Sequence, residues 1–246
     1  TWFRTNLLLM ESGNGLERVA YTADRLQHPE QRAAILDLLQ AADLGITDIE
    51  RIEPDPEVAE RVERALRVLH GFEEESETRK GTQFRVLSSD LVRLHHTGTE
   101  GPTPIEAVHE SHGTRAWISM LGPLLDTLRT GSAVLVDELD GSLHPHLVRE
   151  FIRLFQNRGT NPGCAQLIFN AHDPTILGDS GRRSLGRDQI WLTEKKADGA
   201  TTLYSMAEFR PKRDEALGRR YLQGRYGGVP VLDPAEFQEA TNPNRS

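Results

Sequence analysis

Two short runs of apolar residues stand out in the second half of the chain. Residues 133–136 (Ala-Val-Leu-Val) follow Gly131, and Leu-Ile-Phe at 167–169 belongs to the segment 166–169, which begins with Gln166 and comes after a turn at residues 161–163. Uninterrupted runs of this length are typical of strands buried in a parallel sheet. The segment between them, residues 145–155, carries apolar side chains at helical spacing. The three segments therefore predict one right-handed βαβ unit.

Helical spacing of apolar residues recurs at three other places. Residues 30–42, 56–69 and 114–128 carry apolar side chains at intervals of three and four, which predicts amphipathic helices. Residues 2–10 and 82–94 have a β-like pattern and are expected to contain strands. The first part of the chain is therefore expected to be an α-rich subdomain that also includes a strand.

A loop rich in glycine and proline at residues 98–104 marks a change of architecture. We expect residues 1–104 to hold the strand and the helical subdomain, and residues 105–246 to form a lobe in which helices and strands alternate. Within this lobe, residues 189–193 and 201–206 flank a turn and predict a hairpin at the edge of the parallel sheet. The predicted fold class is α/β, with a parallel-strand core and an α-rich inserted subdomain.

The composition is that of a globular protein, because 37% of the 246 residues are hydrophobic and 27% are charged. No run approaches the roughly 18 to 20 apolar residues of a membrane helix, and no signal-peptide pattern begins the chain, so we expect a cytoplasmic protein without a membrane partner. The single cysteine, Cys164, excludes an internal disulfide and a cysteine-based zinc site. The net charge of -8 restricts any nucleic-acid contact to a local basic patch.

Acidic residues follow abruptly at the end of the predicted strand at residues 133–136. Asp137 and Glu138 stand at the carboxyl edge, where open α/β sheets bind ligands. An apolar strand ending in Asp-Glu has the form of a Walker B element. In such an element the Asp helps to hold Mg²⁺, and the next carboxylate orients or deprotonates the water that attacks a γ-phosphate. The alternative is an acidic strand end that simply meets solvent, and this motif alone does not decide between the two.

A histidine follows the neighbouring predicted strand. A lone histidine is more often structural than catalytic, but His172 is expected at the same sheet edge as Asp137 and Glu138. From that position its imidazole can donate a hydrogen bond to a terminal phosphate oxygen. The position therefore favours a functional role for His172.

A third element, residues 110–115 (Glu-Ser-His-Gly-Thr-Arg), leads into the helix expected at 114–128. Ser111 has the chemistry of an ordinary N-cap. However, the free N–H groups at a helix N-terminus also bind phosphate, and Gly113 permits close approach of the backbone. Both interpretations stay open from this segment alone.

Taken together, these three elements resemble the ABC-type AAA ATPases of the OLD-like group, which are related more distantly to the heads of SMC and RecF proteins. Residues 110–115 resemble that group's version of the ABC signature, and residues 136–145 (Val-Asp-Glu-Leu-Asp-Gly-Ser-Leu-His-Pro) resemble its Walker B element and D-loop. Residues 166–173 resemble its H-loop strand. The resemblance runs from about residue 105 to 231 and includes the tail at residues 221–230.

The resemblance implies an ABC/SMC-like ATPase head that uses ATP and Mg²⁺. At the matching positions it implies Mg²⁺ support by Asp137, activation of water by Glu138 and sensing of the γ-phosphate by His172. It also implies D-loop contacts by Ser142 and His144. Finally, it implies phosphate contacts across a dimer for four residues of the signature: Ser111, His112, Gly113 and Thr114.

The same resemblance implies a head-to-tail dimer around two nucleotides, and we expect the chain to associate with itself as this dimer or as a higher homo-oligomer. Members of the group commonly restrain a nuclease or another toxic effector in bacterial anti-phage defence, so such an effector is an expected partner, and nucleic acid is a further candidate. No G-x-x-x-x-G-K-[ST] motif occurs, since residues 12–15 (Ser-Gly-Asn-Gly) lack the lysine and the spacing. We therefore expect hydrolysis only once an upstream Walker A segment completes the site.

Two other functions stay open from the sequence. One is an SMC- or RecF-like DNA repair head, although the helical part at residues 30–72 is too short for long coiled-coil arms. The other is a non-catalytic scaffold that depends on nucleotide.

Overall fold

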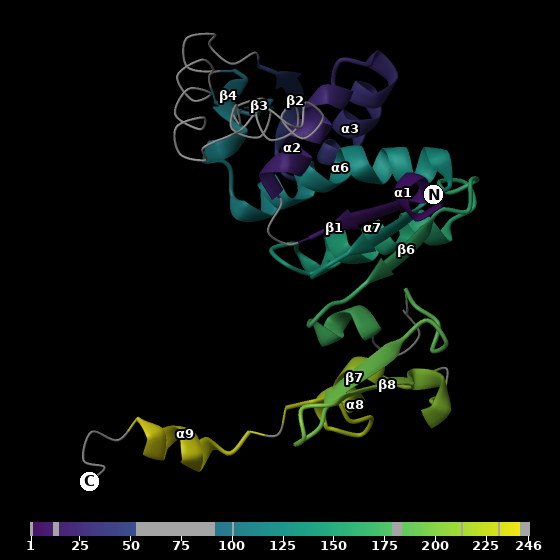
Figure 1. Ribbon diagram of the computed structural model, residues 1–246. Helices are drawn as coiled ribbons and strands as arrows, with labels where there is room; N and C mark the ends of the chain where they lie inside the picture. The colour runs from purple at the N-terminus through teal and green to yellow at the C-terminus, as the bar shows by residue number, and fades with distance from the viewer. Residues whose placement is uncertain are drawn as a thin grey trace, which may run out of the picture. The chain divides into compact units, whose positions relative to one another are not determined.

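The chain divides into two compact units, Thr1–His172 and Asp173–Ser246, which are described separately. The boundary expected after residue 104 falls inside the first unit, where strand β4 (Thr103–Glu106) spans it. The helix expected at residues 56–69, and the greater part of the β-like segment 82–94, lie outside the described residues. The computed structural model (Figure 1) describes residues 2–11, 15–52, 92–99, 101–178, 184–212, 214–230 and 232–241.

The first unit is built around a parallel three-stranded sheet. Its strands are β1 (Leu7–Met10), β5 (Ala133–Val136) and β6 (Gln166–Phe169), in the order β1-β5-β6. Both pairs are parallel, and Val136 lies opposite Phe169 in the register of β5 and β6. Helix α7 (Pro145–Gln156) connects β5 to β6, so the predicted βαβ unit is confirmed. The α/β fold class with a parallel-strand core is confirmed as well.

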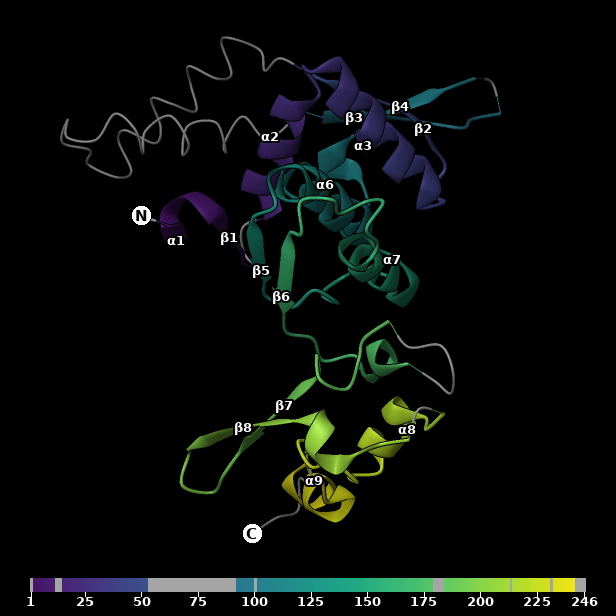
Figure 2. The ribbon, with the colours of Figure 1, turned by 90° about the vertical axis from the view of Figure 1, so that its right-hand side faces the viewer.

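The two faces of this sheet differ in burial. Met10, Val134 and Val136 point to one face and are buried, whereas Leu9 and Ile168 on the other face are 57% and 56% exposed. Helices α6 and α7 lie on one side of the sheet (Figure 2). The alternation of side chains along each strand therefore directs the most apolar positions toward the helices.

Helix α6 (His112–Thr130) is the longest described helix and packs against α2 (Gly15–Arg25) and α3 (Pro29–Ala41). It ends at Gly131, whose φ of 68° lies in the left-handed region that glycine adopts without strain. The prediction for residues 114–128 is thus confirmed, with two more helical residues at each end. The prediction for residues 30–42 corresponds to α3.

A threonine from α2 enters the backbone hydrogen-bond ladder of α6. The Thr22 hydroxyl donates to the Ile118 carbonyl at 2.9 Å and accepts from the Gly122 N–H at 3.1 Å. These two groups are four residues apart, so the hydroxyl bridges one rung of the helix. The next residue, Pro123, has no N–H to donate. The contact therefore stabilises α6 at the point where its own ladder is weakest.

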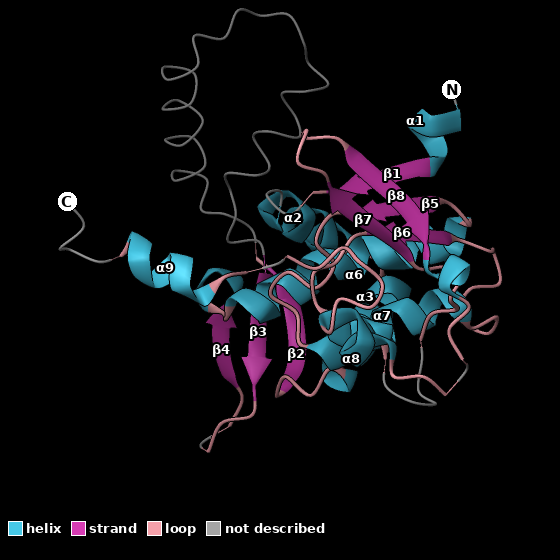
Figure 3. Cartoon of the chain, turned by 90° about the horizontal axis from the view of Figure 1, so that it is seen from below, coloured by secondary structure: helices cyan, strands magenta, loops and turns pink. Residues whose placement is uncertain are grey.

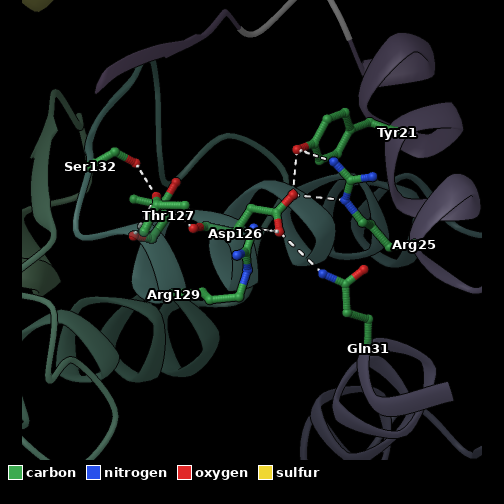
Figure 4. Close-up of polar contacts among 8 residues, drawn as sticks. Tyr21, Arg25, Gln31, Asp126, Thr127, Arg129 and Ser132 are labelled. Carbon is green, nitrogen blue, oxygen red and sulfur yellow. Dashed lines mark hydrogen bonds and ion pairs between the residues drawn. The ribbon is translucent and has the colours of Figure 1, made fainter. Parts of the chain in front are cut away.

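Asp126 fastens α2 and α3 to the same stretch of α6 (Figure 4). Its carboxylate accepts from the Tyr21 hydroxyl at 2.5 Å, from Arg25 Nε at 2.7 Å and from Gln31 Nε2 at 3.2 Å. Burial alone would raise the pKa of the Asp126 carboxyl, but hydrogen bonds from Tyr21 and Arg25 outweigh burial and lower this pKa. Burial and the hydrogen bond to Asp126 raise the pKa of Tyr21. Asp126 therefore stays ionised and paired.

The inserted subdomain contains an antiparallel sheet of which the sequence pattern predicted only one strand, since the strand at Val92–His96 begins inside the β-like segment 82–94 and the other two were not expected. Strands β2 (Ile46–Arg51), β3 (Val92–His96) and β4 form an antiparallel sheet and lie side by side in Figure 3. The buried residues of β2, Ile46 and Ile49, are three positions apart because the register shifts between Ile46 and Asp48. This irregularity breaks the two-residue period by which a strand is recognised. The subdomain is consequently less helical than expected.

The beginning of the chain is also different from the prediction, since Trp2–Asn6 is a short helix, α1, and only Leu7–Met10 is a strand. The hydroxyl of Thr5 and the amide of Asn6 both donate to the Trp2 carbonyl, at 3.2 and 3.3 Å. These local bonds close a helical turn. Trp2 is 55% exposed, so burial does not hold this segment extended.

The second unit has its own small core. Strands β7 (Trp191–Lys195) and β8 (Thr201–Ser205) form the predicted hairpin, but they make a separate two-stranded sheet, so their expected place at the edge of the parallel sheet is wrong. Helix α8 (Leu217–Leu222) belongs to the same unit, as does α9 (Pro234–Ala240). The hairpin is held by this local core, which consists of Ile190, Leu192, Met206, Leu217 and Tyr226.

Short 3₁₀ helices occur in both units. One lies in the first unit, at Ala107–His109, and two lie in the second, at Pro174–Leu177 and Met206–Phe209.

Candidate active site

The carboxyl ends of the three parallel strands meet at one edge of the sheet. Asp137 follows β5 directly, and its backbone N–H donates to the carbonyl of Met10, the last residue of β1, at 2.9 Å. Asn170 follows β6 directly, and its N–H donates to the Val136 carbonyl at 3.3 Å. The backbone thus carries the residues after β5 and β6 to the same place, as the parallel topology requires.

Asn170 joins the ends of these two strands through its side chain. Its Oδ1 accepts from the Glu138 backbone N–H at 2.6 Å, and its Nδ2 donates to Oδ1 of Asp137 at 2.9 Å. The Asn170 carbonyl also accepts from the Leu139 N–H at 3.1 Å. Reasoning from the sequence missed this residue. The signal that was available is its position, because a polar amide at the end of β6 must lie beside the acidic end of β5.

The turn after β5 has an unusual backbone. Glu138 has a φ of 53° and Ser142 a φ of 68°, both in the left-handed region that residues other than glycine adopt at a cost of about 1 to 2 kcal/mol. The Gly141 N–H closes the turn by donating to the Glu138 carbonyl at 2.8 Å. Outliers of this kind persist where the surroundings hold them in place, and here Asn170 binds the Glu138 N–H.

His172 reaches the same edge, as its position in the sequence predicted. Its Nε2 lies 3.8 Å from Oε1 of Glu138, and its side chain is 80% exposed. The His172 backbone N–H donates to Oδ2 of Asp140 at 2.9 Å, which ties the loop after β6 to the turn after β5. The imidazole therefore faces solvent next to the Glu138 carboxylate.

The N-terminus of α6 lies against the turn after β5. Ser111 is its N-cap, because its Oγ accepts from the Thr114 N–H at 3.1 Å and lies 2.8 Å from the Thr114 hydroxyl. His112 Nδ1 lies 2.6 Å from the hydroxyl of Ser142. A Cβ on Gly113 would lie 2.9 Å from the Ser142 carbonyl, so this contact requires glycine. Capping by Ser111 is thus observed, and its contact with nucleotide stays a prediction.

Two further residues near the site, Glu110 and His144, make hydrogen-bond contacts with neighbouring groups. Glu110, which precedes Ser111, has its Oε1 2.5 Å from Nε2 of His96 on strand β3, and the Glu110 side chain is only 9% exposed. His144 is the N-cap of α7, with its Nδ1 accepting from the His146 N–H at 3.2 Å. The first contact holds the signature turn to the antiparallel sheet. The second gives His144 a structural role beside the predicted D-loop role.

These elements enclose a cavity of about 380 Å³ in the first unit. Four of the site residues predicted from the sequence line it, namely Glu138, Asp137, His112 and Ser142. Arg115 also lines it, and its Nε is buried without a hydrogen-bond partner in the described part of the chain. The cavity therefore combines two carboxylates with a guanidinium at the end of a helix.

The carboxylates at this edge suit a Mg²⁺ ion that is also bound by water and substrate, and they do not suit a metal ion bound by protein side chains alone. Within the residues that the structure describes, no group of three His, Cys, Asp or Glu side chains could hold a metal ion. Mg²⁺ usually binds one or two carboxylates together with water and substrate phosphates. Asp137 and Glu138 are both exposed at the cavity, so they could hold a Mg²⁺ ion that also binds phosphate.

Comparison with protein families gives the context of this site. Residues 7–178 match the family described as "AAA domain, putative AbiEii toxin, Type IV TA system". The chain belongs to this family. AAA domains are nucleotide-binding ATPase domains, and the match includes every element of the site, from β1 to the loop after β6. No curated protein and no solved structure matches the chain. Among the helices of the described residues, none is long and apolar enough to cross a membrane.

Proposed function

We propose that this chain is the catalytic lobe of a Mg²⁺-dependent ATPase. The observation that carries the proposal is the meeting of Asp137, Glu138 and His172 at the carboxyl edge of two adjacent parallel strands. In this proposal Asp137 would help to hold the metal, Glu138 would orient or deprotonate the attacking water, and His172 would donate a hydrogen bond to the terminal phosphate. Bound Mg²⁺ would neutralise charge on the phosphates.

A phosphate-binding loop is the part that the 246 residues do not supply, because they contain no G-x-x-x-x-G-K-[ST] motif. We propose that a segment outside these residues provides it. The backbone N–H groups and the lysine of such a loop make most contacts to the β- and γ-phosphates. The experiments below therefore use the protein that carries this segment together with residues 1–246.

Dimerisation around nucleotide is the second part of the proposal. Ser111, His112, Gly113 and Thr114 form the N-terminal turn of α6, where free N–H groups and the helix dipole favour an anion. We propose that this turn contacts the phosphates of a nucleotide held by a second copy of the chain, in a head-to-tail dimer. Ser142 lies against the turn, so it would reach the same interface.

Control of a toxic effector is the biological role that we propose for the ATPase. The family description names a toxin and a toxin–antitoxin system, which supports a role in bacterial conflict. In this proposal the nucleotide-bound dimer restrains a nuclease or another toxic protein during anti-phage defence. Copurification of the protein with such a partner, released by ATP hydrolysis, is the expected result.

The test of catalysis is the substitution Glu138→Gln. It preserves the size of the side chain and removes the carboxylate, so ATP should still bind while turnover falls by on the order of 10²-fold or more. The matched control is Glu150→Gln, since Glu150 is an exposed residue of α7 that pairs with Arg153 one turn further along the helix. Steady-state phosphate release measures both. Turnover at the parental rate in Glu138→Gln would show that Glu138 is not the catalytic carboxylate.

The test of the dimer uses two substitutions of the same N-cap. Ser111→Asp and Ser111→Asn both keep a good capping residue, so α6 should remain stable in each. Only Asp adds a negative charge where the phosphate of the second copy would lie. In the Glu138→Gln background with ATP, sedimentation should show dimers for Ser111→Asn and monomers for Ser111→Asp. Equal dimer fractions would reduce Ser111 to an N-cap alone.

A further inference from the structure

Asn170 makes a contact that neither the signature nor the Walker B pattern assigns. One amide side chain binds the backbone of Glu138 with its oxygen and the carboxylate of Asp137 with its nitrogen, at 2.6 and 2.9 Å. Asparagine offers an acceptor and a donor from the same branched carbon, whereas an ionised aspartate of the same shape only accepts and leucine does neither. The two contacts therefore depend on asparagine itself, not merely on a polar residue.

The hydrogen bond from Asn170 engages only one of the two carboxylate oxygens of Asp137. Oδ1 accepts from Nδ2 of Asn170, whereas Oδ2 has no hydrogen-bond partner in the part of the chain that the structure describes. Asp137 lines the cavity and is exposed there. A carboxylate fixed through one oxygen keeps the other available to water or to a metal ion.

We propose that Asn170 is a positioning residue for the metal-binding carboxylate. Its Nδ2 fixes the rotation of Asp137 so that Oδ2 serves the Mg²⁺ ion or its water. Its Oδ1 holds the left-handed backbone of Glu138, which sets the direction in which that side chain leaves the strand. This inference rests on the proposed ATPase function, and it adds the residue that aligns the two carboxylates with each other.

Two substitutions separate the two contacts. Asn170→Leu has the same branching but loses both of them. Asn170→Asp keeps an acceptor for the Glu138 N–H and replaces the donor with an oxygen that repels Asp137. Asn157→Leu is the matched control, because Asn157 also accepts a backbone N–H, from Gly159 at 2.8 Å, in the turn after α7.

Two measurements report on the metal. The first is the dissociation constant for Mn²⁺ in the presence of a non-hydrolysable ATP analogue, from the electron paramagnetic resonance of the free ion. The second is ATP turnover as a function of Mg²⁺ concentration. Loss of a residue that orients a metal ligand typically costs 10- to 100-fold in affinity or activity. We expect a loss of about this size in Mn²⁺ affinity and in kcat for both Asn170 variants, with the KM for ATP changed less than about threefold.

The outcomes distinguish the inference from the proposed function. Melting temperatures close to the parental value in Asn170→Asp, together with weaker Mn²⁺ binding, support the positioning role. Parental Mn²⁺ affinity in a folded Asn170→Asp protein overturns it, as does an equal loss in Asn157→Leu. A parent that binds Mn²⁺ with the analogue but hydrolyses no ATP overturns the proposed hydrolysis and leaves the Mn²⁺ comparison valid. A parent that does not bind Mn²⁺ overturns both.

Discussion

Removal of the Asp126 carboxylate should weaken the first unit by a predictable amount. Its oxygens accept from Tyr21, Arg25 and Gln31, and also from Arg129 at 3.3 Å, while the Asp126 side chain is only 14% exposed. A hydrogen bond to a charged group contributes about 1.5 to 3 kcal/mol. Loss of one partner of a buried ion pair costs about 3 to 5 kcal/mol. Arg25 is 27% exposed and can regain water, so we expect Asp126→Ala to lower the free energy of unfolding by about 3 kcal/mol, the low end of this range.

The charge and the shape of this side chain can be tested separately. Asp126→Asn keeps the shape, so its loss should be about half that of alanine. Urea unfolding followed by the fluorescence of Trp117 is a suitable assay, because this tryptophan lies in α6 and is 2% exposed. Asp48→Asn is the control, since Asp48 pairs with Arg32 on the surface and should change the free energy by less than about 1 kcal/mol.

The difference in unfolding free energy between the parent and Asp126→Asn should depend on pH in one direction. The folded pKa of Asp126 is lowered, so its contribution is fully present above the unfolded value of about 3.9 and is lost as the pH falls through the folded value. The gap between the parent and Asp126→Asn should therefore be constant near neutral pH and shrink below about pH 4. Equal stability of the two proteins at pH 7, or a difference that grows in acid, would refute this account of the Asp126 contacts.

Three further outcomes follow from particular contacts. Gly122→Ala should destabilise the protein by about 1 to 3 kcal/mol in urea unfolding, because the new Cβ would lie 2.9 Å from the backbone of α2, whereas Gly15→Ala meets no atom within 4 Å and should not. Tyr226→Phe should cost about 1.5 to 3 kcal/mol in thermal unfolding, since it removes the 2.7 Å hydrogen bond to the Glu215 carboxylate in the second unit. His172→Ala should lower ATP turnover by about tenfold or more with an unchanged melting temperature, because the 80% exposed ring has little packing to lose.

The parts of the fold that the sequence predicted are those whose apolar pattern is regular. The apolar run of β5 between Gly131 and acidic residues indicates a buried strand, and the spacing of α7 indicates a helix. The parallel direction of β5 and β6 then brings Asp137 and His172 to one edge. The irregular parts escaped prediction. The bulge in β2 disturbs the alternation of its side chains, and the turn of α1 depends on hydrogen bonds to the Trp2 carbonyl that no hydrophobic period encodes. The role of Asn170 needed the register of two strands, which is a three-dimensional fact.

The bridge made by Thr22 has a mechanical consequence for the cavity. This hydroxyl and the Asp126 carboxylate bond α2 to α6 at two places within residues 118–126, so relative movement of the two helices would break these bonds. Gly15 at the start of α2 and His112 at the start of α6 both line the cavity, and these two walls cannot separate without breaking buried bonds. The turn at residues 137–142 forms another wall, and several hydrogen bonds hold it, including those of Asn170 to Asp137 and Glu138 and the contact of Ser142 with His112. The walls of the cavity are therefore bonded to one another, so the site is preformed before a ligand binds.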